Sequence, residues 1–457
     1  MLVIEGAAEI GGGARSEPLT LPGFVHDVCS AVHPLAAGSP LLSALPLAQH
    51  GLEWIEPPIA LAHPLDSQRP AILLRDVDET AATLGADANA YRSLFGPLSR
   101  QWTQLAPDVL APLHVPAHPL ALARFGLHAV QSAARLVRQR FSGQRASALI
   151  AGVASHAMEP LGNAGTAAIA LVLIAAGHNV GWPIPRGGSR QITAALSSYF
   201  AQLGGRIETG RPVQALRDLP SARIVLLDVT PRQFVEIAGQ RLPAAYVRAL
   251  RRFRYGPGVF KVDWALAEAV PWQWPVCRRA GTLSLGGSFE EIAANETAVG
   301  RGELPSRPVV LLAQPSLLDT SRAPAGAHTL WGYCHVPNGS TVDMLPSIEA
   351  QIERVAPGFR ERVLARHVMT TADLHARNPN LIGGNIGAGA NTLRQLFFRP
   401  VVRRHPCKTP IPGVYLCSAS TPPGGGVHGM CGYHAAKTAL EDVFHIPIER
   451  AVALGVA

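Results

Sequence analysis

The clearest chemical signal lies near the carboxyl end, where three consecutive glycines precede a predicted helix. Residues 413–443 are GVYLCSASTPPGGGVHGMCGYHAAKTALEDV. We expect a strand over residues 414–417, a tight loop over 422–426 and a helix over 428–443. Such a loop would present backbone amides and the positive end of the helix dipole, and glycines let a flat ring come close. A flavin, whose N1 and C2 carbonyl are negative when reduced, suits this loop.

The same loop also fits a different pattern. Residues 424–429, GGGVHG, satisfy the dinucleotide-binding expression G-x-G-x-x-G. That motif requires a second strand ending in an acid after its helix, and the segment FHIPIE that follows is interrupted by Pro447. We therefore interpret the loop as flavin-facing, and a purely structural glycine turn remains the alternative.

Histidines and a cysteine follow the glycines. His428, Cys431 and His434 have spacings that, on a helix, separate the first and last side chains by roughly 120°. This excludes a well-formed metal site, so we expect none. His428, in the first turn after the loop, is the candidate catalytic side chain, with a structural histidine as the alternative. The sequence has no G-x-S-x-G elbow, which argues against a hydrolase.

A second signal lies at the amino end. The apolar run LVIE at residues 2–5 ends in Glu5 and is followed by Gly11, Gly12, Gly13 and Arg15. In dinucleotide-binding units the second strand ends in an acid that binds a ribose hydroxyl, about 20 residues after the glycine loop. We therefore expect the sequence as given to start at strand two, without the first strand, phosphate-binding loop and first helix. That absence would weaken the hold on a pyrophosphate.

The segments between these signals predict the elements that position them. Residues 20–119 suggest an inserted substrate region, residues 189–203 a helix, and residues 206–213 and 222–230 two strands. Residues 255–382 alternate β-rich runs with turns and contain a helix near 347–355, which predicts a mixed or antiparallel sheet walling a cavity. Tyr255, Trp331 and Tyr333 either line this cavity or belong to the core.

Two apolar patterns in the chain bear on membranes. Residues 124–141 predict one amphipathic helix, with Leu127, Val130, Ala134, Val137 and Phe141 on one stripe and Arg135, Arg138 and Arg140 away from it. This helix either has a solvated basic face or rests on an anionic membrane surface. The apolar run at residues 164–177 is too short to span a bilayer and predicts a buried helix.

Composition limits the functional classes. With 47% hydrophobic and 16% charged residues, the 457-residue chain is a well-buried protein of two or three domains. Its charge of +8 comes almost entirely from arginines and suits anionic ligands, but no basic tract with interleaved aromatics supports nucleic-acid binding. The six scattered cysteines and the absence of a signal sequence predict a reducing, cytoplasmic location, either free or at a membrane surface.

Four ordered motifs together carry a family resemblance. They are E-x4-IGGGAR at the start, LPGF-x-HDVCSAVHP at residues 21–34, P-x-GG-x-R with GGRIETG-x-PV in the centre, and S-x-STPPGGGVHG near the end. Over essentially its whole length the chain resembles the phytoene dehydrogenase and carotenoid desaturase family of flavoproteins, nearest the branch of pyridine nucleotide-disulphide oxidoreductase domain proteins. The resemblance implies an α/β fold: an FAD-binding Rossmann-like domain lacking its first βα unit, a substrate domain with a mixed or antiparallel sheet, and a helical insertion.

The resemblance also assigns residues and segments. It implies that Glu5 binds the ribose, that Gly12, Gly13 and Arg15 run along the diphosphate and ribityl chain, and that Val213 contacts adenine through its main chain. It places Ser420, Gly425, Gly426 and Val427 against the isoalloxazine. Residues 1–30, 186–250 and 383–457 would build the FAD-binding domain, residues 31–185 a helical substrate region, and residues 251–382 the substrate-domain sheet.

The function that follows from the resemblance is hydride exchange between FAD and a small hydrophobic substrate, in a dehydrogenation, an isomerisation or a saturation. One alternative is a catalytically silent binding or regulatory protein of the same fold. Another is a flavin amine-oxidase-like enzyme. A flavin enzyme needs no dedicated protein nucleophile, so the lack of such a motif is expected.

Overall fold

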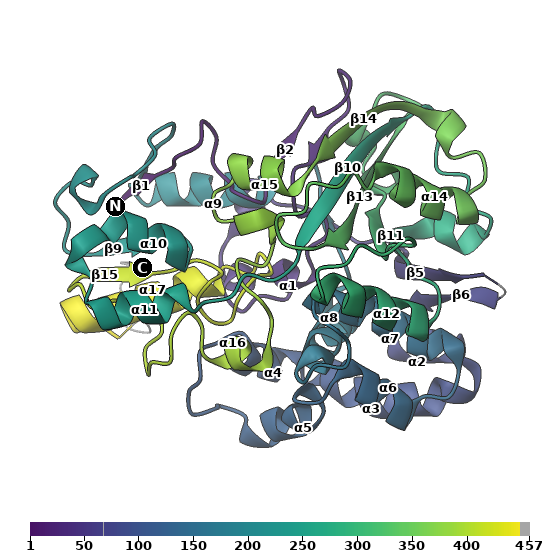
Figure 1. The fold of residues 1–457 in the computed structure, drawn as a ribbon, viewed down its shortest axis with the longest axis horizontal. Helices are drawn as coiled ribbons and strands as arrows, with labels where there is room; N and C mark the ends of the chain where they lie inside the picture. The colour runs from purple at the N-terminus through teal and green to yellow at the C-terminus, as the bar shows by residue number, and fades with distance from the viewer. Residues whose placement is uncertain (67, 448–457) are drawn as a thin grey trace.

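A computed structural model describes residues 1–66 and 68–447 and consists of a sheet-rich part and a smaller part with short parallel strands (Figure 1). The sheet-rich part is built on one mixed seven-stranded sheet. Its strands, in spatial order, are β14 (Val363–Met369), β10 (Gly258–Leu266), β13 (His328–Val336), β12 (Val310–Ala313), β11 (Ala280–Leu285), β5 (Ile59–Leu65) and β6 (Gln68–Leu73). All neighbours are antiparallel except β11 and β5. The α/β fold with a mixed sheet is thus confirmed.

The two faces of this sheet have different neighbours, because successive side chains of a strand point to opposite sides. Phe260, Val262 and Trp264 of β10 pack toward helix α14 (Leu345–Val355) in one apolar cluster. Trp331 and Tyr333 of β13 belong to a separate cluster on the other face. That second face is turned toward the interior of the molecule and is available to wall a cavity.

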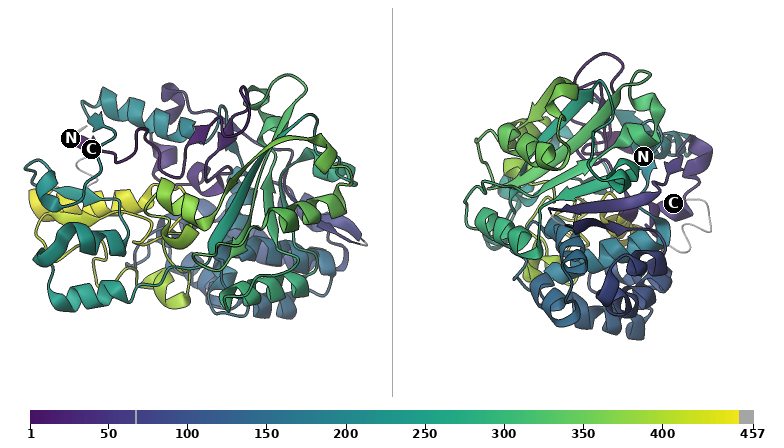
Figure 2. Two further views of the ribbon diagram at one scale, coloured as in Figure 1. Left: turned by 45° about the horizontal axis from the view of Figure 1, so that its top comes forward. Right: turned by 90° about the vertical axis from the view of Figure 1, so that its right-hand side faces the viewer.

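Helices cover the sheet-rich part from below in Figures 1 and 2. They are α2 (Val77–Ala82), α3 (Ala88–Arg100), α4 (Trp102–Val109), α5 (Pro119–Ala129), α6 (Ala133–Arg140), α7 (Gln144–Ala154), α8 (Thr166–Val180) and α12 (Phe289–Gly300). Helix α8 is the predicted buried apolar helix, and its inner residues belong to the largest core cluster. Within residues 1–66 and 68–447, no helix is both long and apolar enough to cross a membrane.

The prediction of one helix over residues 124–141 is wrong. Helix α5 ends at Ala129, and Ser132 starts α6 by accepting the N–H of Arg135 on its side chain at 3.1 Å. Leu127 and Val130, expected on the buried stripe, are 69% and 49% exposed. Two short helices carry the same periodicity as one long helix, so the pattern did not reveal the serine cap between them.

The smaller part holds two separate parallel strand pairs in the described residues. Strand β1 (Leu2–Ile4) pairs with β8 (Arg206–Glu208), and β15 (Val414–Leu416) pairs with β9 (Val225–Leu227). The strand predicted over residues 206–213 is short, because Gly210 with a φ of 67° and then Pro212 follow it. The surrounding helices are α9 (Arg190–Gln202), α10 (Pro231–Ala238), α11 (Ala244–Arg251) and α17 (Met430–Phe444).

Short elements complete the fold at the junctions. They are the paired strands β2 (Ser16–Glu17) and β3 (His26–Asp27), the paired strands β4 (Trp54–Ile55) and β7 (Ile184–Pro185), and the helices α1 (Pro34–Ala37), α13 (Pro315–Leu318), α15 (Thr371–Arg377) and α16 (Leu393–Phe397). The segment FHIPIE begins within the described residues, and its last two positions lie outside them.

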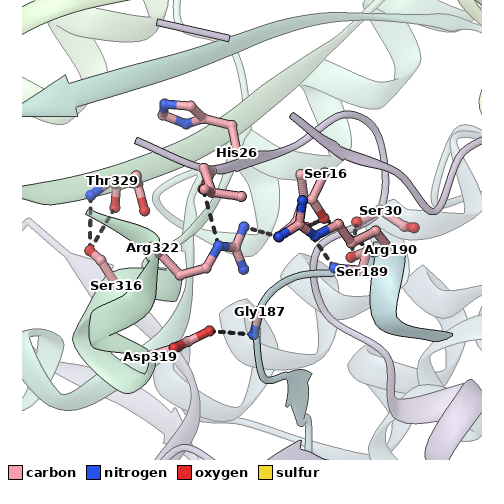
Figure 3. Close-up of polar contacts among 12 residues, drawn as sticks. Ser16, His26, Ser30, Gly187, Ser189, Arg190, Ser316, Asp319, Arg322 and Thr329 are labelled. Carbon is pink, nitrogen blue, oxygen red and sulfur yellow. Dashed lines mark hydrogen bonds and ion pairs between the residues drawn. The ribbon is translucent and has the colours of Figure 1, made fainter. Parts of the chain in front are cut away.

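A buried polar network joins β2, β3, the start of α9 and the turn after α13 (Figure 3). Asp27 accepts hydrogen bonds from Ser16 Oγ at 2.6 Å and Ser189 N at 2.8 Å, and Arg322 Nη2 lies 2.8 Å from its other oxygen. Burial raises the pKa of Asp27, but Arg322 and these hydrogen bonds outweigh burial and lower it below its ordinary value. Through Asp27 and Ser189, the HDVC and P-x-GG-x-R motifs therefore connect the smaller part to the sheet-rich part.

Candidate functional site

A cavity of about 3090 Å³ lies between the parallel strand pairs and the seven-stranded sheet. Its walls include β1 and the loop after it, β9, the glycine loop before α17, and one face of the sheet. Sites for drug-sized ligands usually have volumes of roughly 300–1,000 Å³. This cavity therefore has room for an extended dinucleotide together with a second ligand.

The amino-terminal residues singled out in the sequence line this cavity. Glu5 follows β1, and its Oε1 accepts the N–H of Ala7 at 2.8 Å, which fixes the carboxylate and leaves Oε2 open. Gly12 has a φ of 53°, which favours glycine. Arg15 Nε donates to the Gly12 carbonyl at 3.0 Å. The turn is thus held by its own arginine, and Gly13 follows directly along the cavity wall.

The glycine loop, which lies near the carboxyl end of the sequence, lines the same cavity. Residues 424–427 connect β15 to α17, and Gly424 and Gly426 have φ values of 107° and 144°. A Cβ at Gly426 would lie 2.8 Å from Leu35 Cδ1, and one at Gly425 would lie 3.5 Å from Gly387 Cα. Conformation therefore favours glycine at positions 424 and 426, whereas a Cβ at Gly425 would make an ordinary van der Waals contact.

Arg399, which the sequence analysis missed, supports this loop from behind. Its side chain is fully buried and donates to the carbonyls of Gln395, Ala419 and Ala390 at 2.9, 3.0 and 3.1 Å. Burial lowers its pKa to about 10, so the guanidinium stays charged at neutral pH. No carboxylate within the described residues is paired with it. A positive charge thus lies next to the loop predicted to face a flavin.

Of the other residues predicted to contact FAD, two line the cavity and one is buried behind its wall. Val213 and Val427 line the cavity, and Val427 has a φ of 57°. Ser420 is fully buried, does not reach the cavity, and donates from Oγ to the Ala388 carbonyl at 2.7 Å. Ser420 therefore connects the glycine loop to the segment at Ala388, which itself lines the cavity.

His428 lines the cavity but is tied into the backbone. Its Nδ1 accepts the N–H of Met430 at 3.1 Å, and its carbonyl accepts the Ser39 hydroxyl at 2.6 Å. Burial lowers its pKa to about 4, so the imidazole is neutral at pH 7. With Nδ1 as acceptor, the ring proton resides on Nε2.

The sheet contributes a polar wall that sequence analysis missed in part. Trp331 and Tyr333 line the cavity, whereas the Tyr255 hydroxyl accepts the N–H of Arg232 away from it. Between apolar neighbours on β10, Lys261 also lines the cavity and pairs with the buried Asp263. A signal was present: in VFKVDWAL a lysine and an aspartate occupy alternate positions of a strand that is otherwise apolar.

Comparison with curated proteins identifies sequence relatives. The chain is 29% identical over 300 residues to mouse pyridine nucleotide-disulfide oxidoreductase domain-containing protein 2, covering 57% of this chain and 52% of that protein. It is 26% identical over 280 residues to phytoene desaturase (neurosporene-forming) of Rhodobacter capsulatus, covering 54% and 51%. The chain therefore spans about half the length of the curated relatives it matches. No protein-family model matches it.

Solved structures share the fold at low sequence identity. An oxidoreductase from Methanosarcina mazei aligns with a TM-score of 0.62 and 14% identity over 94% of this chain and 92% of that one. Cyclohexylamine oxidase from Brevibacterium oxydans aligns with a TM-score of 0.55 and 14% identity over 96% and 93%. The family resemblance is confirmed: the chain is related in sequence to pyridine nucleotide-disulfide oxidoreductase domain-containing protein 2 and to phytoene desaturase, and it shares the fold of these solved oxidoreductases.

Proposed function

We propose that this chain is an FAD-dependent oxidoreductase that exchanges hydride with a hydrophobic substrate. The observation that carries the proposal is that residues 5–7 and 11–15 and residues 424–427, from opposite ends of the chain, line one cavity whose remaining wall is largely apolar. Each segment has the chemistry of a flavin contact by itself. Their convergence supports a single cofactor extending across both.

The residues present fit FAD. The open Oε2 of Glu5 suits a ribose hydroxyl, and the bare backbone at Gly12 and Gly13 suits close passage of the ribityl chain. Residues 424–427 suit the flavin ring, with the buried charge of Arg399 behind them to favour negative charge on it. Bound FAD would supply the hydride-accepting or hydride-donating ring.

The substrate side of the cavity is mainly apolar. Ala31, Leu173, Trp182 and Leu311 line it, and these side chains would exclude water and hold an apolar molecule by its surface. This lining favours a hydrophobic substrate over a freely hydrated one.

Flavin content tests the proposal. The full chain should purify with the visible absorbance of oxidised flavin or acquire it with added FAD in a 1:1 complex. A protein that remains colourless and binds no FAD would contradict the proposal and favour the silent binding protein. If flavin is bound, anaerobic bleaching by cyclohexylamine but not by phytoene would favour the amine-oxidase alternative, because bleaching reports electron transfer from the added compound.

We also propose a peripheral contact with an anionic membrane, through which an apolar substrate would enter. Leu120 and Leu127 on the outer face of α5 are 77% and 69% exposed, and the exposed Arg124 lies between them. In the loop before this helix, Leu113 and Val115 are 58% and 91% exposed and also line the cavity. Apolar side chains next to a basic one suit the interface of an anionic bilayer.

A further inference from the structure

One wall of the cavity presents hydrogen-bond donors that are not fully paired with acceptors among the described residues. The strand register places Lys261 opposite Tyr333 and Asp263 opposite Trp331 in β10 and β13, and Thr282 opposite Ala313 in β11 and β12. Because Ala313 is in turn opposite Trp331, these side chains share the inner face of the sheet. Lys261, Thr282, Trp331 and Tyr333 all line the cavity.

Three of these side chains have unused hydrogen-bonding capacity. Trp331 Nε1 and Thr282 Oγ1 are buried and have no hydrogen-bond partner in the described residues. The Lys261 ammonium has three donors, and among the described residues it has one acceptor, Asp263 Oδ2. Trp331 and Thr282 are 9% and 6% exposed, and both line the cavity. Buried donors without acceptors are rare in folded proteins and indicate a ligand or ordered water.

The Lys261 charge is held in place from behind. Asp263 is fully buried, and burial raises its pKa to about 6, with Lys261 acting in the opposite direction. His26 Nδ1 lies 3.7 Å from the second oxygen of Asp263. Burial, Lys261 and Arg322 together lower the pKa of His26 to about 3, so it is neutral. The ammonium also lies 5.7 Å from the ring centre of Trp331, which restricts its movement.

This donor wall borders the segment predicted to run along the diphosphate and ribityl chain of the cofactor. A Cβ at Gly13 would lie 3.6 Å from Cys29 Cβ, and Cys29 packs on the cluster that contains Trp331 and Tyr333. A ligand on the wall would therefore lie beside residues 12–13, on the expected path of the cofactor.

We propose that Lys261, Trp331 and Thr282 bind a carbonyl or carboxylate oxygen of a substrate whose remainder is apolar. Calling this ligand the substrate rests on the proposed function, whereas the binding site itself does not. Lysine and tryptophan only donate, so the wall matches an acceptor oxygen and opposes a cationic amine. An unfunctionalised hydrocarbon would leave the Trp331 and Thr282 donors, and the two Lys261 N–H groups not directed at Asp263, without an acceptor.

Calorimetric titration of the full chain with decanoate, 2-decanone and decylamine tests the proposal. Decanoate and 2-decanone should bind at one site, and decylamine should bind at least about tenfold more weakly, since it offers no acceptor and meets the Lys261 charge. Trp331→Phe and Thr282→Val each remove one donor without changing charge and should each weaken decanoate binding about tenfold. Lys408→Met, which removes an ammonium paired with Asp442 at the surface, should leave binding unchanged.

Lys261→Met should abolish the preference for decanoate over decylamine. Because it leaves Asp263 buried and unpaired, Lys261→Met/Asp263→Asn serves as a second variant, with folding checked by circular dichroism. Equal affinities for decanoate and decylamine, or undiminished decanoate binding in Trp331→Phe and Thr282→Val, would overturn the proposal. Flavin absorbance is recorded on every sample, so that the two proposals can fail separately. A flavin-free protein that still prefers decanoate would contradict the proposed oxidoreductase function but support this binding site. A flavoprotein that shows no preference for decanoate would support the oxidoreductase function but contradict this binding site.

Discussion

At the scale of single residues, Arg399 both stabilises the structure around the glycine loop by hydrogen bonds and places a positive charge beside the loop. Arg399→Met would leave the buried carbonyls of Gln395 and Ala419 without this side-chain donor and would remove one of the two donors to the Ala390 carbonyl. We expect a loss of about 3 kcal/mol in the free energy of unfolding, measured by urea denaturation. FAD affinity should fall as well, since the positive charge behind the loop is removed. Unchanged stability would show that the loop holds its shape without this side chain.

Two glycines offer a matched pair. Gly426→Ala should reduce FAD binding at least about tenfold, because a φ of 144° and a Cβ 2.8 Å from Leu35 Cδ1 force the loop to shift. Gly126, in α5, has nothing within 4 Å of an added Cβ and lies outside the cavity lining. Gly126→Ala should therefore keep FAD binding and raise stability by about 0.5–1 kcal/mol. Titration with FAD and thermal unfolding of both variants check this, and equal FAD affinity in the two variants would contradict it.

At the scale of elements, α5 carries apolar side chains on its exposed face as well as on its buried face. Ala121, Phe125 and Ala129 face the core, whereas Leu120 and Leu127 face outward. Leu120→Gln/Leu127→Gln should reduce co-sedimentation with phosphatidylglycerol vesicles several-fold and leave the melting temperature nearly unchanged, because exposed side chains contribute little to folding.

The contact has a second signature and a control. Raising the salt concentration should weaken vesicle binding, since Arg124 would attract the anionic surface. Leu364→Gln changes a 53% exposed leucine on the edge strand β14 and should not affect binding. Vesicle binding that is equal in all three proteins, or that does not depend on anionic lipid, would rule out the contact through α5.

At the scale of the whole molecule, buried histidines make stability depend on pH. Burial lowers the pKa of His33, His63, His156 and His428 to about 4, and that of His26 to about 3, from 6.5. Between pH 6.5 and 4 the unfolded chain therefore binds more protons than the folded protein, and stability falls as the pH falls. Asp263, whose pKa burial raises to about 6, acts in the opposite direction but is outnumbered.

Calorimetry across this range checks the expectation. The melting temperature should be highest near or above pH 7 and should decrease steadily between pH 6.5 and 4. His63→Gln is informative because His63 Nε2 donates one hydrogen bond, to the Gly287 carbonyl, and His63 lies outside the cavity lining. This variant should have a smaller dependence on pH over the same range. A melting temperature that is constant over this range would contradict the assignment of neutral buried histidines.

The sequence alone determined the features that short contiguous segments encode. The glycines at 424–426, the acid after the first strand and the apolar run of α8 each depend on neighbours in the chain, so their types and spacing predicted a loop, a strand end and a buried helix. The strand pattern of residues 255–382 likewise predicted strands β10 to β14 of the sheet, since alternation is a local property, whereas β5 and β6 come from an earlier segment.

The tertiary structure decided what depends on distant partners. Lys261, Thr282 and Trp331 come from three strands, and only the register among β10, β11, β12 and β13 places them on one cavity wall. Arg399 gains its role from carbonyls of a loop about 20 residues away. The break between α5 and α6, and with it the exposure of Leu127, was equally invisible to periodicity. Hydrophobic spacing specifies which residues are buried within an element, but the choice of facing partner is made by packing between elements.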